Sequence, residues 1–167
     1  LADHVRLRAK RFPPVNGSVF QSQINHLFSK PAQSLMDRLP IPGLFRLTLQ
    51  TLRTINDNGI NPLVIRHFEL NLAIHLGYRP QLNQCVVCGG NQALTGFSLA
   101  EGGMICRGCL PATSTGIITM SGECLAILRQ LEGANSSVLA RIRASASDLK
   151  QLEYFLWTYL QNNMARS

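Results

Sequence analysis

The chain has 167 residues, 46% of them hydrophobic, which is enough to bury one moderate core and to carry a small metal-held subdomain. Its apolar stretches end before the roughly 20 residues that a membrane-spanning helix needs, so the sequence predicts a soluble protein with no membrane partner. The 16 lysines and arginines against 9 aspartates and glutamates give a net charge of +7. This excess favours a polyanionic partner, with nucleic acid ahead of an acidic protein surface.

Residues 1–17 are predicted to form a basic arm. Its cations alternate with small apolar residues, so an extended backbone would place Arg6, Arg8 and Lys10 on one face. Such a face attracts phosphate, which makes Arg6 and Arg8 candidate DNA contacts. A solvated terminal arm is an equally good interpretation. The opening residues also suggest that the chain is a piece of a longer protein.

Residues 18–84 are predicted to form the first part of a helical domain. Apolar residues recur at helical spacing over 18–29, where Pro31 ends the run, and over 44–55, where Asn58-Gly59 ends it. Two helices are therefore expected before residue 60.

The clearest helix signals lie between residues 61 and 77. Asn61 is a good N-cap, Pro62 fits the first helical position, and Gly77 fits a left-handed helix end. Apolar residues between them cover more than one narrow stripe, which predicts a central helix that is buried on most sides.

Residues 85–120 contain the strongest motif of the chain. Two Cys-x2-Cys pairs, Cys85 with Cys88 and Cys106 with Cys109, have 17 residues between them. Such pairs turn both sulfurs toward one point, and this spacing is typical of a tetrahedral four-thiolate zinc site with Zn–S distances of about 2.3 Å. The sequence therefore predicts one structural Zn²⁺, because four thiolates leave no coordination position open for catalysis.

Disulfides and free thiols are the competing interpretations of these cysteines. Secreted disulfide domains are usually shorter and denser in cysteine, and no apolar signal segment precedes the motif, which favours a reducing cytoplasm. Cys124 lies in an apolar run outside the pattern and is predicted to be a buried small hydrophobe.

A β-hairpin is expected between the two cysteine pairs. Residues 94–99 and 103–105 can pair around a turn at Glu101-Gly102, and residues 116–120 can add a further strand. This segment has few large apolar residues, so the metal would supply much of its folding energy.

Residues 121–167 are predicted to form the second part of the helical domain. Ser121 can cap one helix, and Ser147-Asp148 can begin the last one. Tyr154 and Trp157 lie partly off the apolar face of the last helix, and packing against a neighbouring helix is favoured over base stacking. The expected fold is mainly α, a helical bundle with an inserted four-cysteine zinc finger on a short β-hairpin.

Several of these residues resemble the RecO family of bacterial recombination mediators. The similarity is carried by the junction into the first cysteine pair, by the second pair and by the last helix: Phe68-Glu69-Leu70, Leu76-Gly77-Tyr78, Pro80, Leu82, Cys85 to Gly89, Gly102 to Cys109, and Leu156 to Arg166. It spans roughly residues 44–167 and is most specific at the junction.

The resemblance implies a non-enzymatic DNA repair protein of the bacterial cytoplasm and nucleoid. RecO proteins combine an N-terminal OB-fold with a helical, zinc-finger domain. They bind single- and double-stranded DNA, anneal complementary strands, and work with RecR to load RecA on DNA coated by single-stranded DNA-binding protein. No run of five alternating strands precedes the helices here, so the OB-fold is expected to be missing.

The remaining candidate DNA contacts are scattered cations: Arg66 and Arg79 beside the family-like junction, and Arg107, Arg141, Arg143 and Lys150. Contacts of this kind would be to phosphate, independent of sequence and weakened by salt. The alternative is a zinc-stabilised protein adaptor with little DNA affinity of its own. The histidines show no catalytic arrangement with carboxylates or serines, so neither an enzyme nor a small-molecule substrate is expected.

Overall fold

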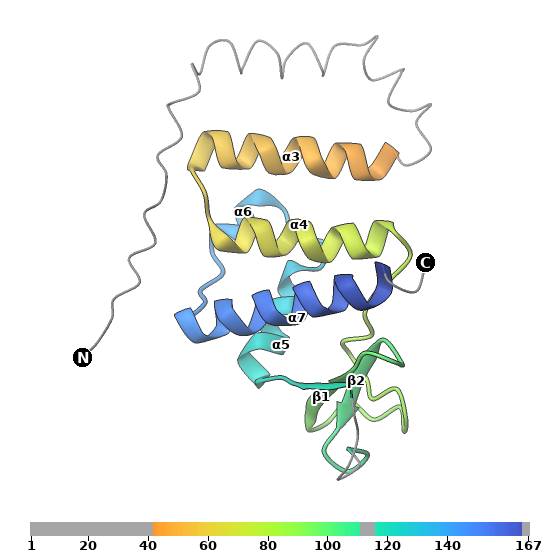
Figure 1. Cartoon of the computed structure of the whole chain (residues 1–167). Helices are drawn as coiled ribbons and strands as arrows, with labels where there is room; N and C mark the ends of the chain where they lie inside the picture. Colours follow the sequence, from red (N-terminus) through yellow and green to blue (C-terminus); the bar gives the residue numbers. More distant parts are fainter. Residues whose placement is uncertain (1–41, 111–115, 165–167) are drawn as a thin grey trace, which may run out of the picture. The chain divides into compact units, whose positions relative to one another are not determined.

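The computed structural model describes residues 42–110 and 116–164. Within these ranges lie five helices and three strands (Figure 1): α3 (Pro42–Asn58), α4 (Pro62–His75), β1 (Leu94–Ser98), β2 (Gly103–Cys106), β3 (Ile117–Thr119), α5 (Gly122–Leu131), α6 (Ser136–Leu139) and α7 (Ala146–Met164). The predicted combination of helices with a small sheet is confirmed. The predicted helix over 18–29 and the arm with Arg6 and Arg8 lie outside the described residues, and the predicted domain boundaries stay predictions.

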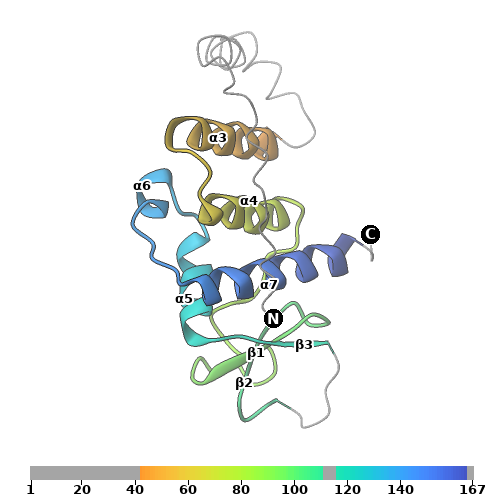
Figure 2. The ribbon, with the colours of Figure 1, turned by 60° about the vertical axis from the view of Figure 1, so that its left-hand side comes forward.

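The helices α3 and α4 begin and end close to the predicted positions. Gly59 follows α3 with φ 76°, and Gly77 follows α4 with φ 90°. The Asn61 side chain caps α4 by accepting a hydrogen bond from the backbone N–H of Leu63 at 2.9 Å. A Cβ added to Gly43, at the start of α3, would lie 2.7 Å from the imidazole of His75, at the end of α4. The two helices therefore run antiparallel (Figure 2).

The hydrophobic core is shared by the helices and the sheet. Helix α7 packs on both α4 and α5, and β1 lies against α7 (Figures 1 and 2). Three aromatic rings join the two parts, with Phe97 on β1 lying 4.8 Å from Phe155 and 5.3 Å from Tyr159 between ring centroids. Phe97 and Phe155 are fully buried, so the sheet is anchored to the helices by burial of aromatic surface.

The sheet has the order β2-β1-β3, with both pairings antiparallel. Phe97 of β1 stands opposite Met104 on β2 and Ile118 on β3. Gly102 completes the hairpin turn with φ 67°, a left-handed conformation that glycine adopts without strain. Both the predicted hairpin and the further strand are confirmed.

Three features of the helical part differ from expectation. The short helix α6 was not predicted. Helix α7 is capped by Ser145 rather than Ser147, because the Ser145 hydroxyl accepts from the N–H of Asp148 while the Asp148 carboxylate accepts from the N–H of Ser145. Tyr154 and Trp157 are exposed, so the expected packing against a neighbouring helix is wrong.

Of the helices in the described ranges, none has the length and apolar character needed to cross a bilayer.

Candidate metal centre and basic side chains

The first cysteine pair lies in a tight turn after Leu82. The N–H of Cys85 donates to the carbonyl of Gly90 at 2.7 Å, and the N–H of Gly89 donates back to the carbonyl of Cys85 at 2.9 Å. Gly89 has φ 74°, which most other residues adopt only with strain. These hydrogen bonds fold the chain around the two sulfurs of Cys85 and Cys88.

The second pair begins at the end of β2. The N–H groups of Cys109 and Leu110 donate to the carbonyl of Cys106 at 3.0 and 3.1 Å, which closes a turn of the same kind. The N–H of Arg107 donates to the carbonyl of Ala93 at 2.9 Å, so the turn is also fastened to the chain that precedes β1.

Gly103 allows the two turns to approach each other. It lies on β2 beside Gln81, whose backbone carbonyl accepts from the N–H of Met104 at 2.9 Å. A Cβ at position 103 would lie 2.3 Å from Val86 Cγ1 and 2.9 Å from Gln81 Cβ. The absence of a side chain therefore lets the first turn lie directly against β2.

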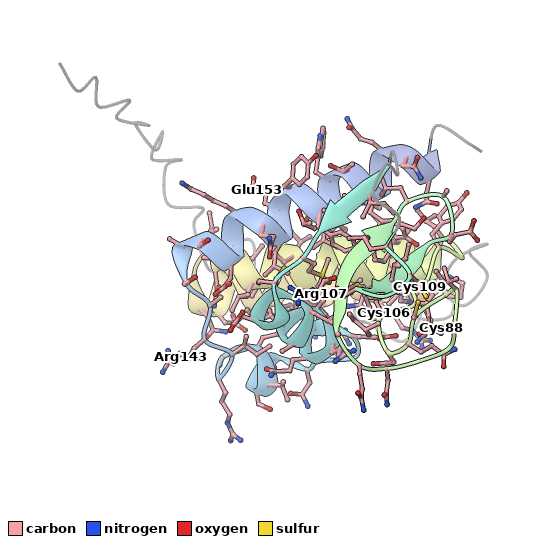
Figure 3. All side chains as sticks on the ribbon, turned by 90° about the horizontal axis from the view of Figure 1, so that it is seen from below. Cys88, Cys106, Arg107, Cys109, Arg143 and Glu153 are labelled. Atoms are coloured by element: carbon pink, nitrogen blue, oxygen red, sulfur yellow. The ribbon has the colours of Figure 1, made fainter. Side chains whose placement is uncertain are left out.

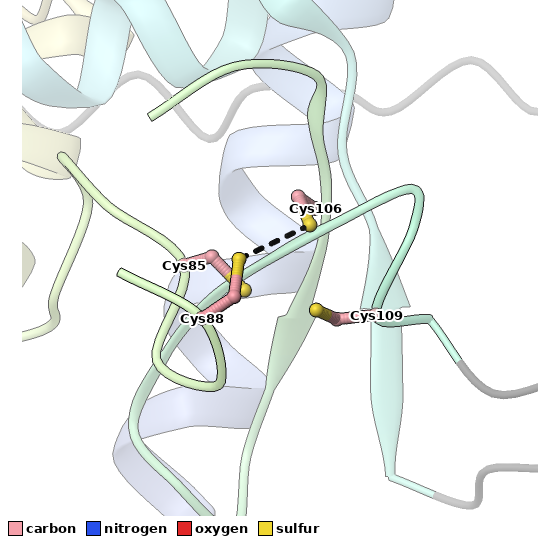
Figure 4. Close-up of side chains that lie close together, drawn as sticks. All are labelled: Cys85, Cys88, Cys106 and Cys109. Carbon is pink, nitrogen blue, oxygen red and sulfur yellow. Dashed lines mark hydrogen bonds between the residues drawn. The ribbon is translucent and has the colours of Figure 1, made fainter. Parts of the chain in front are cut away.

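As a result, the four cysteine side chains meet at one point (Figure 4). Their sulfurs all lie within 4.8 Å of one another, and Cys88 Sγ lies 3.7 Å from Cys106 Sγ. A zinc ion with four Zn–S bonds of about 2.3 Å requires sulfurs roughly 3.8 Å apart, whereas a disulfide requires about 2.05 Å. The geometry therefore fits four thiolate ligands around one ion, and Cys124, fully buried in the core, stands apart as predicted.

The protonation of these thiols is uneven. Burial raises the pKa of Cys85, but backbone hydrogen bonds at Cys106, Cys88 and Val87 outweigh burial and lower that pKa to about 6. Hydrogen bonding to the Cys106 and Cys88 sulfurs raises the pKa of Cys109 to about 12. Thiols this close cannot all ionise together unless a cation compensates their charge. A divalent metal ion held by the four sulfurs would supply that charge, and its binding would release the remaining protons.

Two of the predicted DNA contacts are engaged by glutamates within the chain. Arg66 Nη2 lies 3.2 Å from Glu69 Oε1 on the same helix, with side chains 13% and 21% exposed. Arg79 pairs with Glu132 at the end of α5, and the Arg79 side chain is 65% exposed. DNA phosphate would have to compete with these carboxylates.

The other described candidates lie on separate surfaces. Arg107 is exposed in the second cysteine turn, and Arg141 and Arg143 are exposed between α6 and α7. Figure 3 shows Arg107 near the cysteines and Arg143 at the opposite side of the view. Arg66 and Lys150 do come together, since both line a hollow of about 620 Å³ between α4 and α7. Arg107 and Arg143 therefore lie far apart, whereas Arg66 and Lys150 share one hollow.

One positioning residue was not identified from the sequence. Arg129 on α5 donates to the carbonyl of Leu82 from Nε at 3.1 Å and from Nη2 at 2.7 Å. This contact fastens α5 to the chain just before the first cysteine turn. An arginine at an exposed helix position has no sequence signal that separates this role from that of a surface charge.

Comparison with known proteins assigns the family. Residues 32–167 match the family described as recombination protein O C terminal. A protein of Syntrophomonas wolfei named DNA repair protein RecO is 44% identical over 124 residues, which cover 74% of this chain and 49% of the relative. Proteins of the same name from Roseiflexus and Dehalococcoides mccartyi are 32% and 34% identical over 73% and 67% of this chain, and 44% of each relative is covered.

No solved structure matches the chain. The chain spans about half the length, or slightly less, of these curated relatives. The family match over residues 32–167 covers most of the chain, and the chain therefore belongs to the RecO family, in the region of its C-terminal domain.

Proposed function

We propose that this chain is the C-terminal part of a non-enzymatic mediator of recombinational DNA repair. It contacts single- and double-stranded DNA, promotes strand annealing, and helps RecR to load RecA on DNA coated by single-stranded DNA-binding protein in the bacterial cytoplasm. The match of residues 32–167 to the RecO C-terminal family is the observation that carries this proposal. The relatives named DNA repair protein RecO support the role in repair.

The four clustered cysteines hold a structural Zn²⁺ in this proposal. Cys85 and Cys88 supply two thiolates from the first turn, and Cys106 and Cys109 supply two from the second. The ion, when bound, neutralises the thiolates and ties the turns together. The surrounding backbone hydrogen bonds of Cys85, Gly89 and Cys109 orient the ligands before binding.

DNA binding in this proposal depends on exposed cations. Arg107, Arg141, Arg143 and Lys150 have exposed side chains, and the whole chain carries a net charge of +7. Contacts from such side chains to phosphate release counterions, so affinity falls steeply with salt and depends little on sequence.

A protein adaptor with weak DNA affinity is a second candidate function. It is favoured by the pairing of Arg66 with Glu69 and of Arg79 with Glu132, which reduces the positive charge available to phosphate. An adaptor would bind purified RecR through its helical surface while showing little affinity for oligonucleotides.

Fluorescence anisotropy separates the two functions. A labelled single-stranded oligonucleotide is titrated with the zinc-loaded chain at low and moderate salt, together with the double variant Arg141→Gln, Arg143→Gln and the exposed neutral control Gln130→Ala. The mediator proposal predicts binding that weakens with salt, and a salt slope reduced by about 0.7 for each phosphate contact that the double variant loses. No binding at low salt would contradict DNA contact by this chain and leave the adaptor.

A further inference from the structure

The outer face of α7 carries a stripe of exposed side chains that the core does not use. Its members recur every three or four residues and share this one face: Ser147, Lys150, Tyr154, Trp157 and Gln161. Tyr154 and Trp157 each expose 61% of their surface. Aromatic rings gathered on an exposed helix face are characteristic of binding sites.

Two hollows flank this stripe. One, of about 620 Å³, is lined by Arg66 and Glu69 from α4 and by Lys150, Glu153, Tyr154 and Trp157 from α7. The other, of about 390 Å³, lies between α7 and β3. Lys150 and Tyr154 line both hollows, so these two side chains stand at the centre of an open surface that extends from α4 to the edge strand of the sheet.

We propose that this stripe binds single-stranded DNA, with bases stacked on Tyr154 and Trp157 and a backbone phosphate held by Lys150. The inference rests on the proposed DNA-binding function and locates its base contacts on one face. Residues 154 and 157 are separated by about 4.5 Å along the helix axis, which lets neighbouring bases of one strand reach the two rings. Single strands are favoured because their bases are free to leave the stack, whereas duplex bases are already paired.

The charges around the stripe set the path of the strand. Lys150 is the one charged member of the stripe, and it is a cation. On the α4 side, Glu69 engages Arg66. The exposed Glu153 of α7, labelled in Figure 3, lines the same hollow as Tyr154. The hollow between α7 and β3 is lined by Lys150 and by no carboxylate, so phosphates are expected on that side of the rings. Glu153 opposes binding by repulsion on the α4 side.

The chain contains a single tryptophan, so Trp157 reports directly on this face. The zinc-loaded chain is titrated with an oligothymidylate and with an abasic oligonucleotide of equal length, and intrinsic emission and the anisotropy of the labelled strand are followed in parallel. The proposal predicts saturable quenching by the oligothymidylate and little quenching by the abasic strand. Binding detected by anisotropy with unchanged Trp157 emission overturns the proposal while leaving the DNA-binding function intact. Absence of binding overturns both.

Substitutions test the same face without relying on tryptophan. Tyr154→Ala is expected to weaken oligothymidylate binding about tenfold, whereas Tyr154→Phe retains it, because stacking uses the ring. Ile60→Ala is the matched control, since Ile60 is 80% exposed and lies in the loop between α3 and α4. The Ile60→Ala variant should bind oligothymidylate as tightly as the unmodified chain does. An equal loss of affinity in Ile60→Ala and Tyr154→Ala would contradict the proposal.

Glu153→Gln separates DNA from a basic protein partner. Removal of a carboxylate beside the strand should raise DNA affinity roughly twofold at low salt, the scale of one exposed charge interaction. If the stripe instead accepts a cationic side chain of a protein, the same substitution leaves DNA affinity unchanged and weakens that protein's binding. That result would overturn the assignment to DNA.

Discussion

The helices and the cysteine turns differ in how much surface they bury. In α4, α5 and α7, Leu70, Leu128 and Leu152 have no exposed surface at all. Between residues 83 and 93, by contrast, Cys85 is the one fully buried side chain and Val86 is half-buried. Burial of apolar surface stabilises the helices, whereas the turns have little to bury, and in the proposed account metal ligation would hold their shape.

Strand β1 belongs to both regions. Its Phe97 packs on Phe155 and Tyr159 of α7, while its hairpin partner β2 ends at Cys106. The sheet thus connects the buried helical core to the cysteine turns, which the proposed metal ion would stabilise. Four substitutions should affect the two regions to different extents.

Cys85→Ser should have the largest effect. Loss of one thiolate removes most of the zinc affinity, and structural zinc in small peptides contributes on the order of 10 kcal/mol at neutral pH. Amides of residues 81–110 should exchange with solvent much faster, while those of α4 and α7 stay protected, as measured by hydrogen–deuterium exchange. Cys124→Ala is the control that keeps the zinc content. Equal loss of protection across all helices would show that the regions are not stabilised separately.

Phe155→Ala should destabilise both regions together. The ring is fully buried between Phe97 and Tyr159, and its truncation should cost about 3–5 kcal/mol. Denaturant unfolding followed by circular dichroism measures the loss, with Tyr154→Ala as an exposed aromatic control on the same helix. A loss below about 1 kcal/mol would mean that β1 and α7 do not share a core.

Gly103→Ala should loosen the turns without opening the helical core. The new methyl group would meet Val86 and Gln81, and relief of this overlap should cost about 1–3 kcal/mol. The zinc affinity of Gly103→Ala, measured by competition with a chelator, should fall. Gly108→Ala is the control, because a Cβ at position 108 has open space around it, and its zinc affinity should change less. Equal affinities for the two variants would contradict the close contact at Gly103.

Glu132→Gln should have the smallest effect on stability and a measurable effect on the affinity for single-stranded DNA. The exposed pair with Arg79 contributes below about 1 kcal/mol, so thermal unfolding should change little. Arg79 becomes available to phosphate, and affinity for single-stranded DNA should rise roughly twofold at low salt. Unchanged affinity would remove Arg79 from the DNA contacts and strengthen the adaptor interpretation.

Much of the fold follows from local signals. Asn61, Pro62 and Gly77 delimit α4 because caps act within a few residues, and Glu101-Gly102 locates the hairpin turn for the same reason. Helix α6 was missed because four residues are too few to show a period. The cap of α7 was misplaced although Ser145 and Asp148 have capping-box spacing.

The candidate site was predictable only in part. The cysteine cluster follows from spacing, since each Cys-x2-Cys turn is local and the hairpin returns the second pair to the first. The partners of Arg79 and Arg129 depend on how distant segments of the chain pack together, which a single sequence does not reveal, whereas Arg66 pairs with Glu69 on the same helix. Tyr154 and Trp157 are exposed, as their position off the apolar face of α7 allows, whereas the general tendency of aromatic rings to pack predicts burial, which is wrong here.

X-ray absorption at the zinc K-edge, combined with the metal content per chain, tests the metal centre most directly. The four-thiolate account predicts about one zinc per chain and a first shell of four sulfurs at about 2.3 Å, unchanged in Cys124→Ala and lost in Cys85→Ser. A first shell that contains nitrogen or oxygen ligands, or a folded chain that binds no zinc when the metal is supplied, would contradict it.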